Sequence, residues 1–248
     1  MELTIYQIDV NTLSIYLELS LVLISSVFVL LILNKYLQRR KPLKLKLFFI
    51  FLFIVIGLFL VWVSRVTYYP LNVEGMDPYS ILGWILYRIG YYRFTFILIT
   101  ISCYITYTLK VAIFNEGKAN AVVRGILIIF GGINIFVSLF VFDEAPDAVI
   151  DDLLAFGLMF IYVLMVYLEF TIKSFRLARR LNKSAYKTAI QSLVIMSVCF
   201  ILTNCFFLLD RVWIMLMGTY YSVFYYLADV SLIVGIIGAY FGYIRPKS

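Results

Sequence analysis

Five polar or ionisable side chains interrupt the long apolar segments of this chain and are the residues best placed to do chemistry. They are Glu18, Arg93, Asn204, Asp210 and Asp229. Charged groups are costly inside a bilayer, so they usually face the interior of a helix bundle and mark ion or ligand sites. All five fall in the same half of the predicted membrane. This placement predicts a polar pocket in which Arg93 neutralises Asp229 or Glu18 and a ligand or cation changes that pairing.

The same residues allow a structural interpretation. Helices in lipid associate through polar contacts, so Arg93 and Asp229 could instead form an ion pair that braces the third and seventh segments. The sequence leaves pocket and brace open. Glu169 is different, because it precedes Lys173 by four residues, the favourable order for an ion pair within one helix. Interhelical hydrogen bonds are expected from a group of mid-segment side chains, Thr100, Asn134, Ser138 and Thr203.

The groups that most enzymes need are missing. The chain has no histidine, which excludes a serine–histidine dyad, a histidine zinc helix and histidine-ligated haem. Intramembrane aspartyl catalysis needs two facing aspartates, and only Asp229 lies well inside a segment. The three cysteines, Cys103, Cys199 and Cys205, suit apolar packing, and no glycine-rich phosphate loop is present. We therefore predict no enzyme, with no catalytic residue, no cofactor and no metal.

The elements that would hold these residues are membrane-spanning helices. Of 248 residues, 64% are hydrophobic and only 14% are charged, against about a quarter charged in soluble domains. A helix of about 20 apolar residues crosses a bilayer. Seven segments qualify, at residues 13–33, 47–66, 89–113, 122–142, 153–172, 188–209 and 222–243. We predict an all-α membrane protein whose single domain, residues 1–248, is a seven-transmembrane-helix bundle.

The third segment is too long for one upright helix. Apolar and aromatic residues run from Tyr79 past Thr108, and thirty helical residues would measure about 45 Å. We predict a short interfacial helix from Tyr79 to Ile89 that turns at Gly90 into the span. A single steeply tilted helix is the alternative. In the seventh segment, Gly238 and Gly242 form a Gly-x-x-x-Gly motif, which favours close helix packing within the chain over dimerisation.

Charge asymmetry predicts the orientation. Most of the 21 lysine and arginine residues follow spans one, three, five and seven: 35, 39–41, 44, 46, 110, 118, 124, 173, 176, 179, 180, 183, 187, 245 and 247. The opposite connections are acidic, with Glu74, Asp77, Asp143, Glu144, Asp147, Asp151, Asp152 and Asp210. Basic loops stay in the cytoplasm. We therefore predict a multi-pass plasma-membrane protein with its amino terminus outside and its carboxyl terminus cytoplasmic, and we expect the first span to be retained.

Two short stretches resemble the microbial rhodopsins. Residues 229–235, Asp-Val-Ser-Leu-Ile-Val-Gly, look like the seventh rhodopsin helix, in which an aspartate precedes the retinal lysine by four residues; that position is Ile233 here. Arg93, followed by Phe96 and Thr100, is similar to the third helix, but Phe96 stands where the counterion carboxylate belongs. The resemblance implies a related scaffold that forms no retinal Schiff base.

The closing segment resembles a different family. Residues 238–246, Gly-Ala-Tyr-Phe-Gly-Tyr-Ile-Arg-Pro, look like the end of the seven-helix sensor regions of archaeal and bacterial histidine kinases. This likeness implies a free-standing sensor module.

Three functions fit these observations. The first is a receptor or sensor with an outward-facing polar pocket, signalling through a partner. The second is a small-solute or ion transporter or channel, which is disfavoured because all five prolines lie outside the apolar cores. The third is a non-catalytic scaffold subunit. The basic inner loops predict contact with anionic lipid headgroups or a cytoplasmic signalling partner; a homo-oligomer stays open, and no nucleic-acid partner is expected.

Overall fold

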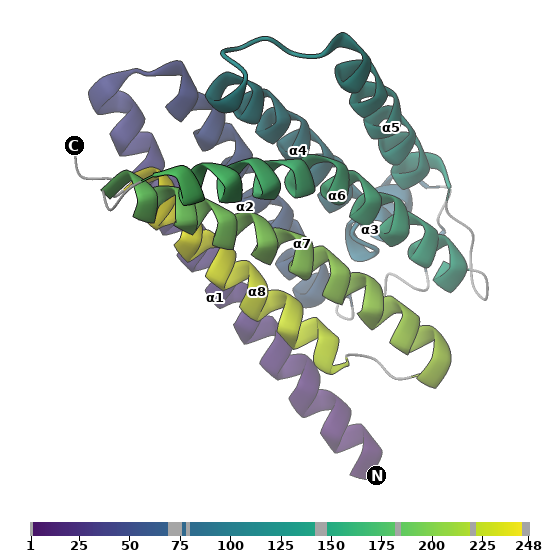
Figure 1. Cartoon of the computed structure of the whole chain (residues 1–248). Helices are drawn as coiled ribbons and strands as arrows, with labels where there is room; N and C mark the ends of the chain where they lie inside the picture. Colours follow the sequence, from purple (N-terminus) through teal and green to yellow (C-terminus); the bar gives the residue numbers. More distant parts are fainter. Residues whose placement is uncertain are drawn as a thin grey trace.

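The structure is a computed structural model that describes residues 2–68, 76–77, 80–141, 148–181, 185–218 and 222–244. These residues form a helical bundle, and none of them lies in a strand. Of these residues, 92% are helical. The elements in Figure 1 are α1 (Glu2–Arg39), α2 (Pro42–Tyr68), α3 (Ile81–Gly90), α4 (Arg93–Phe114), α5 (Ala121–Phe140), α6 (Ala148–Arg180), α7 (Ala185–Met217) and α8 (Val223–Ala239), which continues as a π-helical turn (Tyr240–Ile244).

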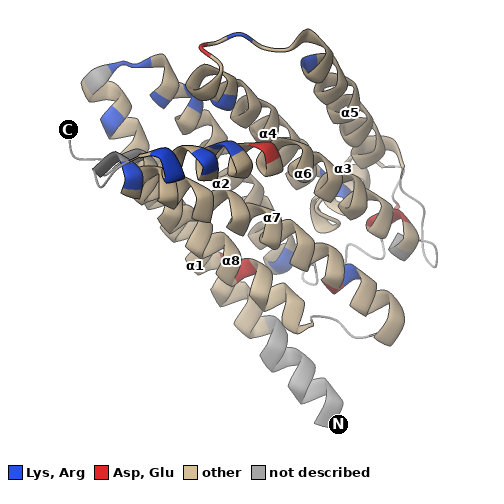
Figure 2. Ribbon diagram, viewed as in Figure 1, with Lys and Arg blue, Asp and Glu red and all other residues tan. Residues whose placement is uncertain are grey.

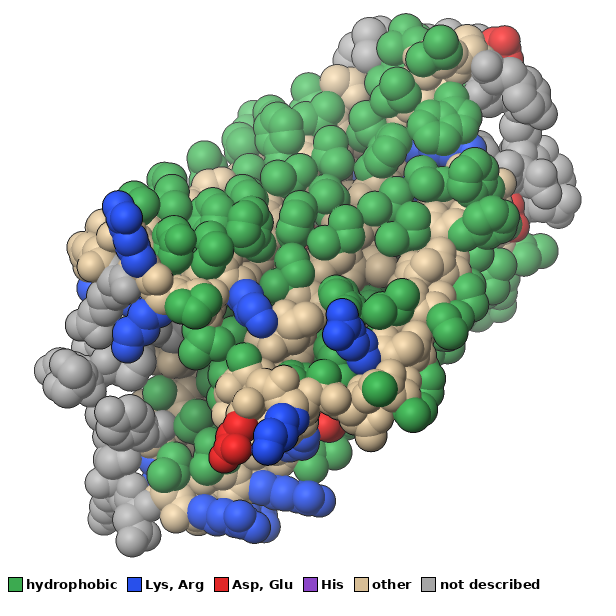
Figure 3. All heavy atoms as spheres, turned by 90° about the horizontal axis from the view of Figure 1, so that it is seen from above, with side chains coloured by type: hydrophobic (Ala, Val, Ile, Leu, Met, Phe, Trp, Pro, Cys, Tyr) green, Lys and Arg blue, Asp and Glu red, His purple; other side chains and the backbone are tan. Residues whose placement is uncertain are grey.

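Seven of these helices are long and apolar enough to cross a membrane, which confirms the predicted all-α, seven-helix fold. They are α1, α2, α4, α5, α6, α7 and α8. Large apolar side chains such as Leu30 on α1 and Ile129 on α5 are more than half exposed. Figure 3 shows apolar side chains over much of one face. A water-soluble bundle would turn polar faces outward, so the fold is that of a multi-pass membrane protein.

Several helices extend beyond the predicted spans. α1 reaches Arg39 and α6 reaches Arg180, so both include basic residues that the sequence placed in connections. Lysine and arginine are good helix formers, and their long side chains can carry charge beyond the apolar core. Helix formation therefore continues past the point where hydropathy falls.

The third segment is two helices, as predicted. Ser80 accepts a hydrogen bond from Gly83 N at 3.0 Å and caps the start of α3. The break lies at Tyr91 and Tyr92, directly after the predicted Gly90, and Tyr92 adopts a left-handed conformation with φ of 61°. α4 therefore begins at Arg93, four residues later than the predicted span. Tyr79, the predicted start of the interfacial helix, lies outside the described residues.

Charge separates along the bundle. Figure 2 shows most lysine and arginine residues near the end at which α1 and α6 finish. Which end faces the cytoplasm stays a prediction from this asymmetry. Seven of the charged residues on which the predicted orientation depends lie outside the described residues: Glu74, Asp143, Glu144, Asp147, Lys183, Arg245 and Lys247.

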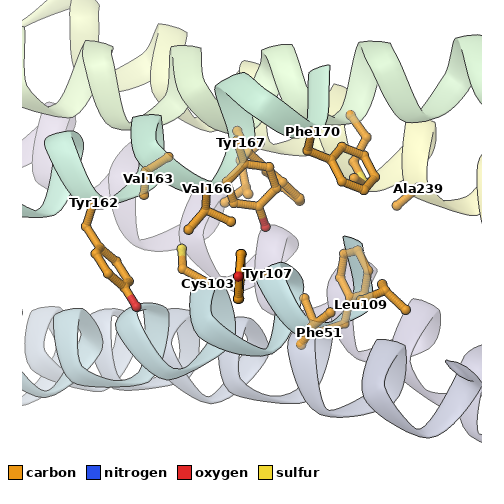
Figure 4. Close-up of a cluster of buried hydrophobic side chains, with 14 of the residues drawn as sticks. Phe51, Cys103, Tyr107, Leu109, Tyr162, Val163, Val166, Tyr167, Phe170 and Ala239 are labelled. Atoms are coloured by element: carbon orange, nitrogen blue, oxygen red, sulfur yellow. The ribbon is translucent and has the colours of Figure 1, made fainter. Parts of the chain in front are cut away.

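The hydrophobic core draws on all seven long helices, and one part of it lies between α4 and α6. Figure 4 shows Tyr162, Val166 and Tyr167 of α6 pointing toward the α4 segment that carries Cys103, Tyr107 and Leu109, with Val163 and Phe170 in the same cluster. All eight side chains are buried. Small polar groups add interhelical links: Asn134 Nδ2 donates to Thr100 Oγ1 at 3.1 Å and Thr203 Oγ1 donates to Ala228 O at 3.4 Å. These two predicted links are confirmed, whereas Ser138 donates to Asn134 O within its own helix.

The glycines of α8 face α7 of the same chain. A Cβ atom added at Gly238 would lie 3.1 Å from Met196 N and from Ser192 O. A Cβ at Gly235 would lie 3.1 Å from the Phe200 ring. The motif therefore permits close approach of two neighbouring helices within the chain, as predicted.

Replacing Gly238 with alanine should lower the free energy of unfolding by about 1–2 kcal/mol, because the opposing atoms belong to the α7 backbone and cannot rotate away. The measurement is reversible unfolding in detergent micelles. Gly132→Ala is the matched control, since a Cβ at Gly132 meets nothing within 4 Å. Equal losses in the two variants would contradict the packing explanation.

Candidate functional site

A cavity of about 110 Å³ lies inside the bundle, with walls from α1, α2, α4, α6, α7 and α8. Most of its wall is apolar or aromatic. The exceptions include a set of polar side chains that we call the polar end of the cavity: Glu18, Tyr92, Asn204, Arg211, Tyr225 and Asp229. Hydrogen bonds join Glu18 to Tyr225 directly and to Tyr92 through Arg65.

Glu18 of α1 is the centre of these contacts. Its carboxylate is 4% exposed, and its Oε1 accepts hydrogen bonds from the hydroxyl of Tyr225 on α8 and from Arg65 Nε on α2, the latter at 3.2 Å. Three helices thus meet at one carboxylate oxygen. The other oxygen, Oε2, is buried and has no hydrogen-bond partner among the described residues.

Tyr92, at the break between α3 and α4, lies between two guanidinium groups. Arg65 donates a hydrogen bond to its hydroxyl, and the Arg211 guanidinium lies 5.4 Å from its ring centroid. Arg211 also lies 4.9 Å from the Phe156 ring, and its buried Nε has no hydrogen-bond partner in the described part of the chain. Burial raises the pKa of the Tyr92 phenol, with the Arg65 charge acting in the opposite direction. Tyr92 is therefore a neutral donor and acceptor.

Asp229 of α8 follows Tyr225 by one helical turn and is 2% exposed. Its Oδ2 is buried without a hydrogen-bond partner in the ranges that the structure describes. A buried carboxylate oxygen is normally hydrogen-bonded. Together with Glu18 Oε2, it gives the cavity wall two unsatisfied acceptors.

The structure brings together three of the five predicted site residues. Glu18, Asn204 and Asp229 line the cavity, although the Asn204 Nδ2 donates to Phe200 O of its own helix at 2.9 Å. Asp210 is elsewhere: it accepts from Ser222 N at 3.0 Å and from Ser222 Oγ at 2.7 Å, which ties the α7 end to the start of α8.

Arg93 is not the partner of Glu18 or Asp229. Its Nη2 donates to Asp152 Oδ1 at 2.9 Å, and its Nη1 donates to Asp151 O at 3.4 Å. The predicted pairing was wrong because α6 begins at Ala148, so Asp152, which the sequence placed in a connection, lies inside a helix beside α4. The Arg93 and Asp152 side chains are 0% and 8% exposed, so they form a buried structural ion pair.

Arg65, the ion-pair partner of Glu18, belongs to the contacts of the candidate site and was missed by sequence reasoning. It lies near the end of the second span, and it is one of the few cations outside the basic connections. A cation among the few that lie in the same half of the bundle as Glu18 was a usable signal.

Two further polar clusters are structural. Glu169 Oε1 accepts from Lys173 at 2.8 Å, which confirms the predicted helical pair, and its Oε2 accepts from Lys110. Lys110 is 1% exposed and lies within α4, not in the following connection. On α3, Arg88 Nε donates to Leu139 O at 2.7 Å; burial and then the Arg93 charge lower its pKa.

Comparison of the chain with protein-family models, with curated proteins and with solved structures found no match. The resemblances to microbial rhodopsins and to histidine-kinase sensor regions therefore stay predictions. Among the described residues, no group of three His, Cys, Asp or Glu side chains could hold a metal ion.

Proposed function

We propose that this chain is a receptor- or sensor-like membrane module that binds a small molecule in the cavity and reports binding to a cytoplasmic partner. One observation carries the proposal: Glu18 and Asp229 line the cavity, are almost fully buried, and each have an oxygen without a hydrogen-bond partner in the described structure. Leaving such a group unsatisfied costs about 1–3 kcal/mol, and more when it is charged. A ligand that donates to these oxygens would offset that cost.

The position of the cavity supports a sensing role. A ligand shifts a conformational equilibrium only by its differential affinity for two states. The Glu18 carboxylate joins α1, α2 and α8 through Arg65 and Tyr225. A ligand that competes for Glu18 would therefore change the packing of three helices at once. In the predicted orientation this end faces outward, and the basic inner loops contact anionic lipids or an acidic partner.

Binding to the cavity can be tested with a probe of one aromatic ring, 4-fluorobenzyl alcohol, in lipid nanodiscs. Fluorine NMR separates protein-bound probe from probe dissolved in lipid. We expect a saturable bound signal, and we expect Ile99→Phe, which places a larger side chain in the cavity from α4, to abolish it. Leu58→Phe obstructs the cavity from α2 and repeats the test. An identical, non-saturating signal in all three proteins would contradict the proposal.

Asp229→Asn should distinguish a binding site from a brace. Because no hydrogen bond to Asp229 is found in the described structure, removing its charge should leave thermal stability unchanged or raise it. A brace would instead lose more than about 1 kcal/mol on losing its partner. Thermal unfolding in detergent measures the difference. A saturable solute flux in liposomes would overturn the receptor proposal in favour of transport.

A further inference from the structure

We infer that the ligand of this cavity is a small protonated organic amine, with its ammonium group at Glu18 and Asp229 and its apolar part against the remaining wall. This inference rests on the proposed function and names the ligand class. It follows from three properties of the cavity: the chemistry of its open hydrogen-bonding atoms, the distribution of its polar groups, and its size.

The hydrogen-bonding atoms that lack a partner on the cavity wall favour a ligand that donates hydrogen bonds and carries positive charge. Glu18 Oε2 and Asp229 Oδ2 are acceptors, whereas Arg211 Nε is the one donor left without a partner on the cavity wall in the described structure. Each ammonium N–H can donate to a carboxylate, and such charge-assisted bonds are about twice as strong as neutral ones. A carboxylate ligand would instead face two buried carboxylates.

The pairing of charged groups around the cavity also favours a cationic ligand. Arg65 is the ion-pair partner of Glu18, and the Arg211 guanidinium lies over the rings of Tyr92 and Phe156. No ion pair of Asp229 is found in the part of the chain that the structure describes. Arg65 and Arg211 equal the two carboxylates in number, but neither forms an ion pair with Asp229 in the described structure, so an added ammonium group would give this carboxylate a paired cation. Buried charges in proteins are normally paired.

The rest of the wall selects an organic cation over a bare metal ion. Most of the remaining lining is apolar or aromatic, including Phe96, Ile99 and Leu232. Such a surface stabilises an apolar body and contributes nothing to a hydrated ion. A volume near 110 Å³ is somewhat below the engineered cavity of about 150 Å³ that holds benzene, so the apolar part of the ligand is no larger than a single ring or a short alkyl chain.

The test compares three probes that share one ring: 4-fluorobenzylamine, 4-fluorobenzyl alcohol and 4-fluorobenzoate. Fluorine NMR titrations in nanodiscs give their dissociation constants for the full chain, with Ile99→Phe as the blank for partition into lipid. We expect the amine, protonated at neutral pH, to bind at least tenfold more tightly than the alcohol, and we expect the benzoate not to bind.

Asp229→Asn is the decisive variant. It should weaken the amine at least tenfold and change the affinity of the alcohol less than threefold. Glu18→Gln should act in the same direction, but Glu18 also holds Arg65 and Tyr225, so Asp229→Asn carries the test if the Glu18 variant unfolds. If the alcohol binds as tightly as the amine, or if Asp229→Asn leaves the amine unaffected, the inference is overturned while the cavity proposal stands. If no probe binds saturably, both are overturned.

Discussion

Replacing Arg93 with leucine should lower the free energy of unfolding by about 3–5 kcal/mol, the largest effect we expect from any single substitution. The Arg93 side chain is fully buried, and its partner Asp152 is 8% exposed. Removing one member of a buried ion pair leaves the other charge without compensation, which costs far more than the net contribution of the pair. Reversible unfolding in detergent micelles measures the loss.

Two further variants identify the cause. Arg93→Leu combined with Asp152→Leu removes both charges, so it should recover most of the stability that the single variant loses. Arg124→Leu removes an exposed arginine at the start of α5 and should change stability by less than about 0.5 kcal/mol. If the double variant is no more stable than Arg93→Leu, packing of the arginine stem, not an unpaired Asp152, explains the loss.

The sequence predicted the elements of the fold well because hydropathy is a local property. Seven apolar segments became seven helices, and the excess length after Tyr79 predicted a separate α3. The ion pair of Glu169 with Lys173 was predictable for the same reason, since both residues belong to one helix and their spacing fixes their geometry. Helix ends were less predictable, because basic residues extend α1 and α6 beyond the apolar core.

The pairing of charges between helices could not be predicted. It depends on which helices are neighbours and on how each is rotated about its axis, and neither property is written in a single sequence. Arg93 was expected to reach Asp229 or Glu18 because all three lie in the same half of the membrane, but α4 places it against Asp152 of α6. Glu18 lines the cavity, yet its ion-pair partner, Arg65, is 47 residues away on α2.

Breaking the ion pair of Glu18 and Arg65 should therefore cause the second-largest loss of stability. The same variant separates a structural role of Glu18 from a ligand-binding role. Arg65→Leu should cost about 3 kcal/mol, at the lower end of the range for buried pairs, because the Arg65 side chain is 21% exposed. Among the described residues, the Glu18 carboxylate would keep only the Tyr225 hydroxyl as a hydrogen-bond partner. Arg176→Leu, at an exposed position near the end of α6, is the matched control.

Neutralising Glu18 in the same background tests this explanation. Glu18→Gln combined with Arg65→Leu should be more stable than Arg65→Leu alone, because an amide is far cheaper to bury than an unpaired carboxylate. Arg65→Leu also leaves the polar end of the cavity with two carboxylates and one fewer cation. A protonated amine should consequently stabilise this variant against unfolding more than it stabilises the parent chain, whereas 4-fluorobenzyl alcohol should stabilise both equally. An equal gain from the amine in the two proteins would mean that Glu18 does not share in binding the cation, and Asp229 would then be the single anionic group of the site.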